Sequence, residues 1–185
     1  YKANMIIPQI QENITKSGTY TLPMTCPCCG EPLVIKTTPG GTDFLYCQNQ
    51  HCSARLVQKF VHFCEKTRMN IEGLSESTLE KFISHGWIRN FGDLYELEKH
   101  KDEIVNTEGF GEKSYQRLQN SIEKSRKCTL DKFIAGLGIP MVGRHAGRIL
   151  NDFFKGDWNA FEQAVIDGFD FKSLPDFGEI MYSNI

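Results

Sequence analysis

Four short breaks recur along the chain at a nearly constant period, and a stretch with helical character follows each of them. Each break reads apolar, any, small or variable, apolar, small, except that the second has Thr107 where the others have an aliphatic residue. The middle positions are 73, 109, 141 and 176, spaced by 36, 32 and 35 residues. We call residues 71–75, 107–111, 139–143 and 174–178 the first to fourth turns. Repeats of this period are typical of stacked helix pairs, so the breaks predict four helix-hairpin-helix repeats.

The apolar pattern between the breaks is helical. From Ala54 onward apolar residues recur with a period of about 3.6, as Leu56, Phe60 and Cys64 illustrate. We expect helices near residues 54–65, 76–85, 92–104, 112–124, 129–136, 144–154, 158–167 and 178–185. The sequence therefore predicts a mainly α protein in which residues 54–185 form one all-α domain of four repeats.

The second turn has the residue types of a phosphate-binding site. Gly109 and Gly111 flank Phe110, which can turn inward as an anchor, while the missing side chains let a phosphate approach the backbone. The next helix is expected to begin with unsatisfied N–H groups and the positive end of its dipole, which favour an anion. The side chains that can add donors from the first turns of that helix are those of Lys113, Ser114 and Arg117.

The four turns are unequal. Only the second has both glycines, because Ser75 replaces the second glycine of the first turn, and Met141 and Asp176 replace the first glycine of the third and fourth. An isolated Gly-x-Gly is more often only a tight connection, and it is the repetition that favours binding. Asp176 would place a carboxylate where a phosphate should lie, so we expect the fourth turn to bind poorly. The candidate phosphate-binding residues are Gly73, Gly109, Gly111, Lys113, Ser114, Arg117, Gly143 and Arg144.

Charge is distributed unevenly along the chain. The formal net charge is only −2, yet residues 111–150 hold eight basic and three acidic residues, and residues 151–185 hold two basic and seven acidic ones. A net of +5 therefore lies beside the second and third turns, and a net of −5 follows it. Local charge governs binding to a phosphate backbone more than the total does.

Four of the seven cysteines lie in two pairs between residues 26 and 52. Cys26 and Cys29 form a C-x-x-C pair before Gly30, and Cys47 and Cys52 follow after a predicted β-hairpin with apolar runs at 33–35 and 44–46. Such pairs suit a closed tetrahedral zinc site, which is structural because no position is left for water. We predict a four-cysteine zinc finger over residues 26–53, whose short segment would depend on zinc for its folding energy.

Two other side chains near the pairs could also act as ligands. Cys28 could replace Cys29, and His51 could replace Cys52, although both changes distort the pair spacing. Cys64 and Cys128 lie on expected helices away from the pairs and are predicted to be buried or surface thiols. The cysteine pattern suits a metal in a reducing cytoplasm better than disulfides in a secreted protein.

The ends of the chain suggest a piece of a longer protein. It starts at Tyr1 without an initiator Met and stops at Ile185 inside an expected helix. Residues 1–25 have no evident core: 6–8 could end a strand, and 17–19 have turn chemistry. No run approaches the roughly 18 apolar residues of a membrane span, so no membrane partner is expected.

The order of these modules resembles the C-terminal half of bacterial NAD-dependent DNA ligases. The stretches that carry the resemblance are 26–30, 47–52, 69–74, 108–114 and 137–143, together with 3–8, which is similar to the end of that family's OB-fold. The resemblance covers nearly the whole chain, with residues 1–25 as the end of the OB-fold and a linker. The order of the modules is more specific than any one motif.

The resemblance implies a function for the parent protein. The family seals 5′-phosphate/3′-hydroxyl nicks in duplex DNA after NAD adenylates a lysine in a K-x-D-G motif, and a BRCT domain often follows the repeats. No K-x-D-G occurs here, and Lys155-Gly156-Asp157 is one residue short of it. The chain would thus contain no catalytic residue, and NAD and magnesium would bind elsewhere in the parent. Its turns would grip minor-groove phosphates, as a cytoplasmic monomer completed by the other domains of the same polypeptide.

Two other classes of protein fit part of the pattern. A stand-alone accessory protein of repair or recombination could carry the same zinc module and repeats. A helix-hairpin-helix glycosylase with an iron–sulfur cluster would place its cysteines after the hairpin and would need a catalytic Asp shortly downstream. Here the cysteines come first, which disfavours the glycosylase.

Overall fold

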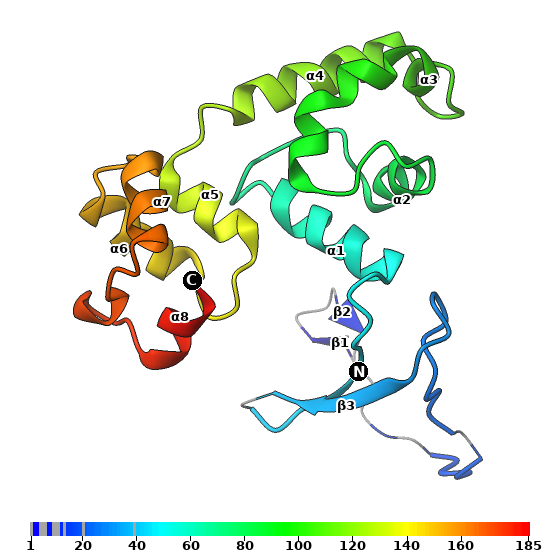
Figure 1. Ribbon diagram of the computed structural model, residues 1–185. Helices are drawn as coiled ribbons and strands as arrows, with labels where there is room; N and C mark the ends of the chain where they lie inside the picture. The colour runs from blue at the N-terminus through cyan, green and yellow to red at the C-terminus, as the bar shows by residue number, and fades with distance from the viewer. Residues whose placement is uncertain (1, 4–6, 9–11, 13, 20, 39) are drawn as a thin grey trace. The chain divides into compact units, whose positions relative to one another are not determined.

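The computed structural model describes residues 2–3, 7–8, 12, 14–19, 21–38 and 40–185, and the chain divides into two compact units, Tyr1–Asn49 and Gln50–Ile185. The first unit contains two small antiparallel sheets. β1 (Lys2–Ala3) pairs with β2 (Ile7–Pro8), and β3 (Leu33–Thr37) pairs with β4 (Asp43–Cys47), as Figure 1 shows in part. The predicted β-hairpin is therefore present. The strand expected at 6–8 is seen at Ile7–Pro8, and positions 4–6 of the stretch similar to an OB-fold lie outside the described residues.

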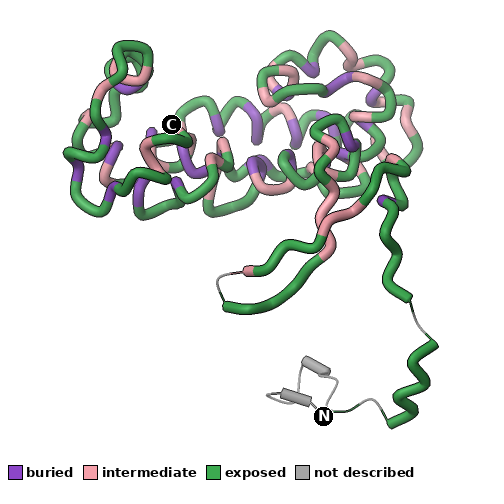
Figure 2. The backbone as a smooth tube through the Cα atoms, turned by 60° about the horizontal axis from the view of Figure 1, so that its bottom comes forward, coloured by how far each residue is buried: buried purple, intermediate pink, exposed green. Residues whose placement is uncertain are grey.

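The first unit has almost no apolar core. Among its residues whose burial is described, Cys26 alone is buried, and Ile35 and Phe44 of the hairpin are 53% and 43% exposed. Figure 2 shows the contrast with the second unit, where buried residues line the helices. Because an isolated two-stranded hairpin is marginally stable in water, this unit needs another source of stability.

The second unit is helical. Its α-helices are α1 (Ser53–Cys64), α2 (Glu76–Ser84), α3 (Lys101–Val105), α4 (Glu112–Ser125), α5 (Leu130–Leu137), α6 (Arg144–Phe153), α7 (Trp158–Ile166) and α8 (Glu179–Asn184). Two 3₁₀-helices, η1 (Phe91–His100) and η2 (Phe171–Ser173), complete the described elements. The predicted fold class, a mainly α protein with a small cysteine-bearing β-hairpin, is confirmed, whereas the predicted domain boundaries at 25 and 53 stay predictions.

One predicted helix differs in kind. The single helix expected over 92–104 is a 3₁₀-helix over Phe91–His100 followed by the short α3. Leu94 and Leu97, which are fully buried, are three residues apart, and a 3₁₀-helix with three residues per turn places both on one face. Asn90 and Asp93 close its start as a capping box.

The first two turns pack reciprocally. The first turn lies against α4, where the Ser121 hydroxyl accepts from the Glu72 N–H at 2.7 Å. The second turn lies against α2, where Lys81 Nζ donates to the Glu108 carbonyl at 2.9 Å and Phe82 contacts the Phe110 ring. Each turn thus contacts the helix that follows the other, and one apolar core joins them.

The third and fourth turns repeat this arrangement around a second core. Asn184 of α8 donates to the Pro140 carbonyl of the third turn at 3.0 Å, and His145 of α6 pairs with Asp176 of the fourth turn at 3.0 Å. The unit therefore consists of two pairs of repeats, seen as the α1–α4 and α5–α8 groups in Figure 1.

Helix α5 joins the two pairs. Its Ala135 carbonyl accepts from His62 Nε2 of α1 at 3.0 Å, and Gly136 leaves room for the Phe63 ring. On its other side it packs closely on α6, where a Cβ at Gly147 would lie 2.8 Å from the Asp131 carbonyl oxygen. This close packing fixes the third turn, which connects α5 to α6, relative to α1.

We predict that Gly147→Ala destabilises the protein. At an exposed position inside a helix, Gly→Ala stabilises the folded protein by up to about 1 kcal/mol, because alanine has the higher helix propensity. Here the added methyl overlaps backbone rather than a flexible side chain, so we expect a loss of about 1–3 kcal/mol in the free energy of unfolding. Denaturant unfolding measures the change, and an increase in stability would contradict the close α5–α6 packing.

Candidate metal centre and nucleic-acid interface

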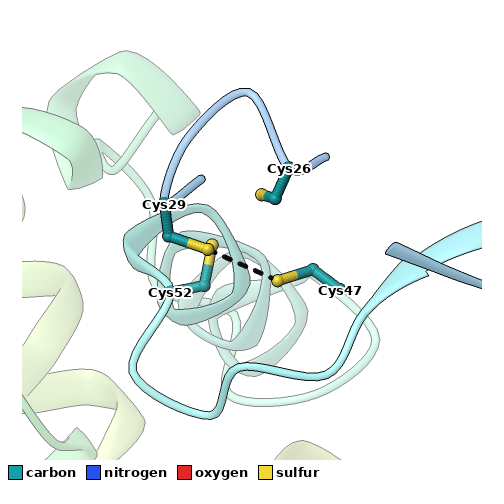
Figure 3. A group of neighbouring side chains, drawn as sticks. All are labelled: Cys26, Cys29, Cys47 and Cys52. Carbon is teal, nitrogen blue, oxygen red and sulfur yellow. Dashed lines mark hydrogen bonds between the residues drawn. The ribbon is translucent and has the colours of Figure 1, made fainter. Parts of the chain in front are cut away.

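The structure brings the four predicted cysteines together. The sulfur atoms of Cys26, Cys29, Cys47 and Cys52 lie within 4.8 Å of one another, and those of Cys29 and Cys47 are 3.6 Å apart (Figure 3). Thiolates about 2.3 Å from a central zinc are about 3.8 Å apart at the corners of a tetrahedron. The cluster therefore has the size and donor set of a four-cysteine zinc site.

Local backbone structure positions these sulfurs. The Cys26 N–H donates to the Glu31 carbonyl and the Gly30 N–H to the Cys26 carbonyl, which closes a tight loop with Gly30 at φ +75°. A positive φ of this size favours glycine, so the expected turn at this residue is explained. Cys47 ends strand β4, and Cys52 is the N-cap of α1.

The environment of the cluster changes thiol acidity. A main-chain hydrogen bond with Glu31 contributes most to the lowered pKa of Cys29, which is about 7. A large part of this thiol is therefore ionised near neutral pH. Burial raises the pKa of Cys47. Zinc binds thiolates, so its binding at the cluster would release protons.

The other candidate ligands lie outside the cluster. Cys28 and His51 are exposed, and neither joins the four grouped sulfurs. Cys64 is buried in the first core, which raises its pKa to about 12, and Cys128 is half-buried. Both lie on or beside helices, as the sequence indicated.

All four turns hold their middle residue in the left-handed region. The φ angle is +93° at Gly73, +82° at Gly109, +66° at Met141 and +61° at Asp176. In the last three turns the N–H of the next residue donates to the carbonyl three positions earlier, at 3.0–3.3 Å, which is the hydrogen bond of a β-turn. The sequence repeat is therefore also a repeat of backbone conformation.

The helices that follow the turns begin differently. Ser75 Oγ accepts from the Thr78 N–H, so the first turn caps its own helix with a side chain. The N-caps of α4 and α6 are Gly111 and Gly143, which offer no such cap. Both glycines have φ angles that any residue adopts, −144° and −90°, and a Cβ on either would meet open space. Neither the backbone nor the packing explains why these two positions are glycine.

Unpaired basic side chains lie beside the second turn. Lys113, Ser114 and Arg117 are exposed on α4, and no carboxylate pairs with Lys113 or Arg117 among the described residues. Arg117 lines a groove of about 490 Å³ with Gly73 of the first turn and with Asn120 and Lys124 of α4. The structure thus joins candidates from two turns in one groove.

Five residues that line the groove were not among the predicted site residues, and Asn120 and Lys124 of α4 are two of them. Asn120 and Lys124 lie three and seven positions after Arg117, a spacing that places all three on one face of a helix. Helical spacing from Arg117 was the signal that could have identified them.

The third and fourth turns differ in charge. Arg144, the first residue of α6, is exposed and lines a separate groove of about 390 Å³ with Gly143. Asp176 of the fourth turn pairs with His145, and both side chains are more than two-thirds exposed. The carboxylate of Asp176 thus lies at the fourth turn, which the sequence predicted to bind phosphate poorly.

Comparison with known proteins gives the family of this architecture. No family model matches the chain. DNA ligases of Ruminiclostridium cellulolyticum, Lachnoclostridium phytofermentans and Acetivibrio thermocellus are 46%, 42% and 35% identical to it over 97%, 98% and 100% of its length. The chain spans about a quarter of the length of these relatives.

The structure thus defines a class of protein in which a module with four clustered cysteines precedes paired helical repeats. Within that class, the chain is homologous to a segment of the DNA ligases. The resemblance to DNA ligases inferred from the sequence is confirmed. No helix in the described part of the chain has the length and apolarity to cross a membrane.

We predict that the chain holds one zinc ion, and that a chelator exposes the cluster while leaving the helices folded. Neither apolar core contains a residue of 26–47, so the helical circular dichroism should change little. Thiol titration with and without chelator should show a gain of four reactive cysteines, those of the cluster.

Two cysteines provide internal controls for this titration. Cys28 is exposed and should react in both states, whereas Cys64 is buried and should react in neither. Thiol reactivity that stays the same after chelation would contradict a metal site.

Proposed function

We propose that this chain is the C-terminal DNA-clamping part of an NAD-dependent DNA ligase. In this proposal it grips nicked duplex DNA by minor-groove phosphate contacts that do not depend on sequence, and the parent enzyme seals 5′-phosphate/3′-hydroxyl nicks in replication and repair. Homology to DNA ligases over nearly the whole chain supports the parent's activity. The monomeric state and the cytoplasmic location belong to the same proposal.

The observation that carries the proposal is the pair of glycines, Gly111 and Gly143, at the N-caps of α4 and α6. Neither fold nor packing requires glycine at 111 and 143. Unlike Gly178, these two glycines begin helices with basic side chains in the first turn, and no carboxylate occupies the left-handed position before them, so we infer a ligand that approaches the helix N-terminus. Unsatisfied N–H groups and the helix dipole favour an anion there. The basic residues Lys113, Arg117 and Arg144 lie beside these ends without a carboxylate partner among the described residues.

The ligand that fits repeated anion sites is a nucleic-acid backbone. Phosphate contacts fix the position of a protein on a duplex but carry no base information, so binding would not depend on sequence. Two pairs of turns on one rigid helical unit would contact successive phosphates. We assign Gly109, Gly111, Lys113, Ser114, Arg117, Gly143 and Arg144 to these contacts, with Gly73 at the edge of the shared groove.

The turns would contribute unequally. The Ser75 hydroxyl already satisfies one N–H of α2, which weakens the first turn as an anion site. The carboxylate of Asp176 and the short α8 weaken the fourth. The second and third turns would therefore provide most of the affinity.

The cysteine module would have a structural role. Zinc would supply the stability that the nearly coreless first unit lacks, and its four thiolates would leave no open position for a reacting molecule. NAD and magnesium would bind to the other domains of the ligase.

We predict that Gly111→Asp weakens DNA binding while leaving the protein as stable or more stable. Aspartate is a favourable N-cap, so its carboxylate should satisfy the N–H groups of α4 and also repel a phosphate. Binding to a nicked duplex of arbitrary sequence, followed by fluorescence anisotropy at fixed salt, should weaken about tenfold.

Gly178→Asp is the matched control for this change. It places the same residue at the N-cap of α8, where the backbone is also extended and the space is also open. We expect little change in affinity, because the fourth turn contributes least. Equal losses for the two variants would contradict the ranking of the turns, and no loss for either would contradict phosphate binding at these N-termini.

We predict that the purified chain seals no nick by itself in the presence of NAD and magnesium. It contains no K-x-D-G motif to supply the lysine that the ligase chemistry needs. A denaturing gel of a nicked, end-labelled duplex measures the product, with a full-length NAD-dependent ligase as positive control. Ligated product formed by the chain alone would overturn its assignment as a non-catalytic part.

A further inference from the structure

A second groove lies where the segment after α1 meets the third turn. It has a volume of about 390 Å³ and is lined by basic residues together with small and apolar residues of α5, its C-cap and the third turn. Three of the lining residues are basic or can become so: His62, Arg68 and Arg144. Arg144 directly follows the third turn, whereas His62 lies on α1 and Arg68 just after it, so this groove joins the two pairs of repeats.

Arg68 is held in this groove with part of its hydrogen-bonding capacity unused. Its side chain is 19% exposed, and Nη1 pairs with Glu65 Oε2 three residues earlier. The Nε and Nη1 atoms are both buried, and neither makes a hydrogen bond of normal geometry to a described residue. A guanidinium has five N–H donors in a planar fork, and leaving a buried donor unsatisfied is unfavourable.

Arg144 places a second positive charge in the same groove. It has no carboxylate partner in the described part of the chain, and it begins α6 beside the uncapped Gly143. Burial, and after it the positive charge of Arg144, lowers the pKa of Arg68. Like charges facing one groove repel each other unless an anion lies between them.

The wall of the groove is rigid. His62 Nε2 donates to the Ala135 carbonyl at 3.0 Å, which ties α1 to α5. The Met69 N–H donates to the Phe63 carbonyl at 3.2 Å, so the segment that carries Arg68 folds back on α1. Arg68 and Arg144 therefore line one groove from two elements, the segment after α1 and the start of α6, and these hydrogen bonds tie the first element to α1 and through it to α5.

We propose that Arg68 and Arg144 form a two-arginine site for one phosphodiester of the DNA backbone, between the two pairs of repeats. The proposal rests on the proposed function, because it assigns a further phosphate to the same interface. Arg68 supplies a fork that matches two phosphate oxygens, and Arg144 and the N-terminus of α6 neutralise the charge. Glu65 is the counter-ion that the phosphate displaces.

Arg68→Gln tests the site. This change removes the charge but keeps a polar side chain of similar length, and we expect affinity for a nicked duplex to fall about tenfold for any sequence. The plot of log affinity against log salt should become shallower by about one, because one phosphate contact is lost. Arg68→Lys should restore the slope and part of the affinity. Arg89→Gln is the matched control, since Arg89 is exposed and lines a groove that contains none of the four turns.

Glu65→Gln tests the site in the opposite direction. If Glu65 competes with the phosphate for Arg68, its neutralisation should strengthen DNA binding severalfold at low salt. For the chain without substitutions, inorganic phosphate or sulfate should weaken DNA binding more than chloride does at the same ionic strength. This difference should disappear in Arg68→Gln. Loss of secondary structure is checked by circular dichroism for each variant.

Each outcome decides between the two proposals. An Arg68→Gln variant with unchanged affinity and slope, or a Glu65→Gln variant that binds DNA less well, would overturn the two-arginine site. If Gly111→Asp still weakens binding in that case, the proposed function holds without it. If neither Gly111→Asp nor Arg68→Gln affects binding, both proposals fail. If free phosphate competes but DNA affinity and slope are unchanged, the site takes a small anion and not the duplex.

Discussion

Packing of the apolar residue after each left-handed position against a core is the constraint on which the helical unit depends. In the first two turns Leu74 and Phe110 are half-buried against the first core. In the third turn Val142 is only 2% exposed, and in the fourth turn Phe177 is 7% exposed. Once that side chain enters the core, the preceding residue must reverse the chain, which is what a positive φ achieves. The next residue is then extended and directs the start of the following helix toward solvent. Core packing and the exposure of amide groups are thus two results of one turn.

The reciprocal packing of the turns explains why they occur in pairs. Each turn contacts the helix that follows its partner, as Ser121 does for the first turn and Lys81 for the second. A single turn with its helix would leave its apolar residue exposed, whereas in a pair both residues pack against one core. The same pairing brings Arg117 beside Gly73 in one groove, although they are 44 positions apart. The residues that we propose to bind phosphate therefore converge from different repeats because the cores require it.

The sequence was sufficient to predict elements whose cause is local. Period-3.6 spacing located the helices, turn residues located the hairpin, and the spacing of cysteines located the cluster, because each signal arises within a few residues. It was insufficient where tertiary contacts decide: the 3₁₀ form of Phe91–His100 follows from burial of Leu94 and Leu97, and η2 had no distinct signal. Arg68 was missed for the same reason, since only the meeting of α1 with the third turn gives it a role.

The two turns without a middle glycine show how the same conformation can be reached with different residues. Pro140 and Pro175 precede Met141 and Asp176, whereas Glu72 and Glu108 precede the glycines of the first two turns. Proline fixes its own φ at the value that this turn position needs, which reduces the conformational entropy lost on folding. That gain offsets the strain of a left-handed residue with a side chain. The residue at the left-handed position can therefore vary in chemistry while the turn conformation stays the same. This is why the same backbone carries a carboxylate, Asp176, in the fourth turn and an uncharged residue, Met141, in the third.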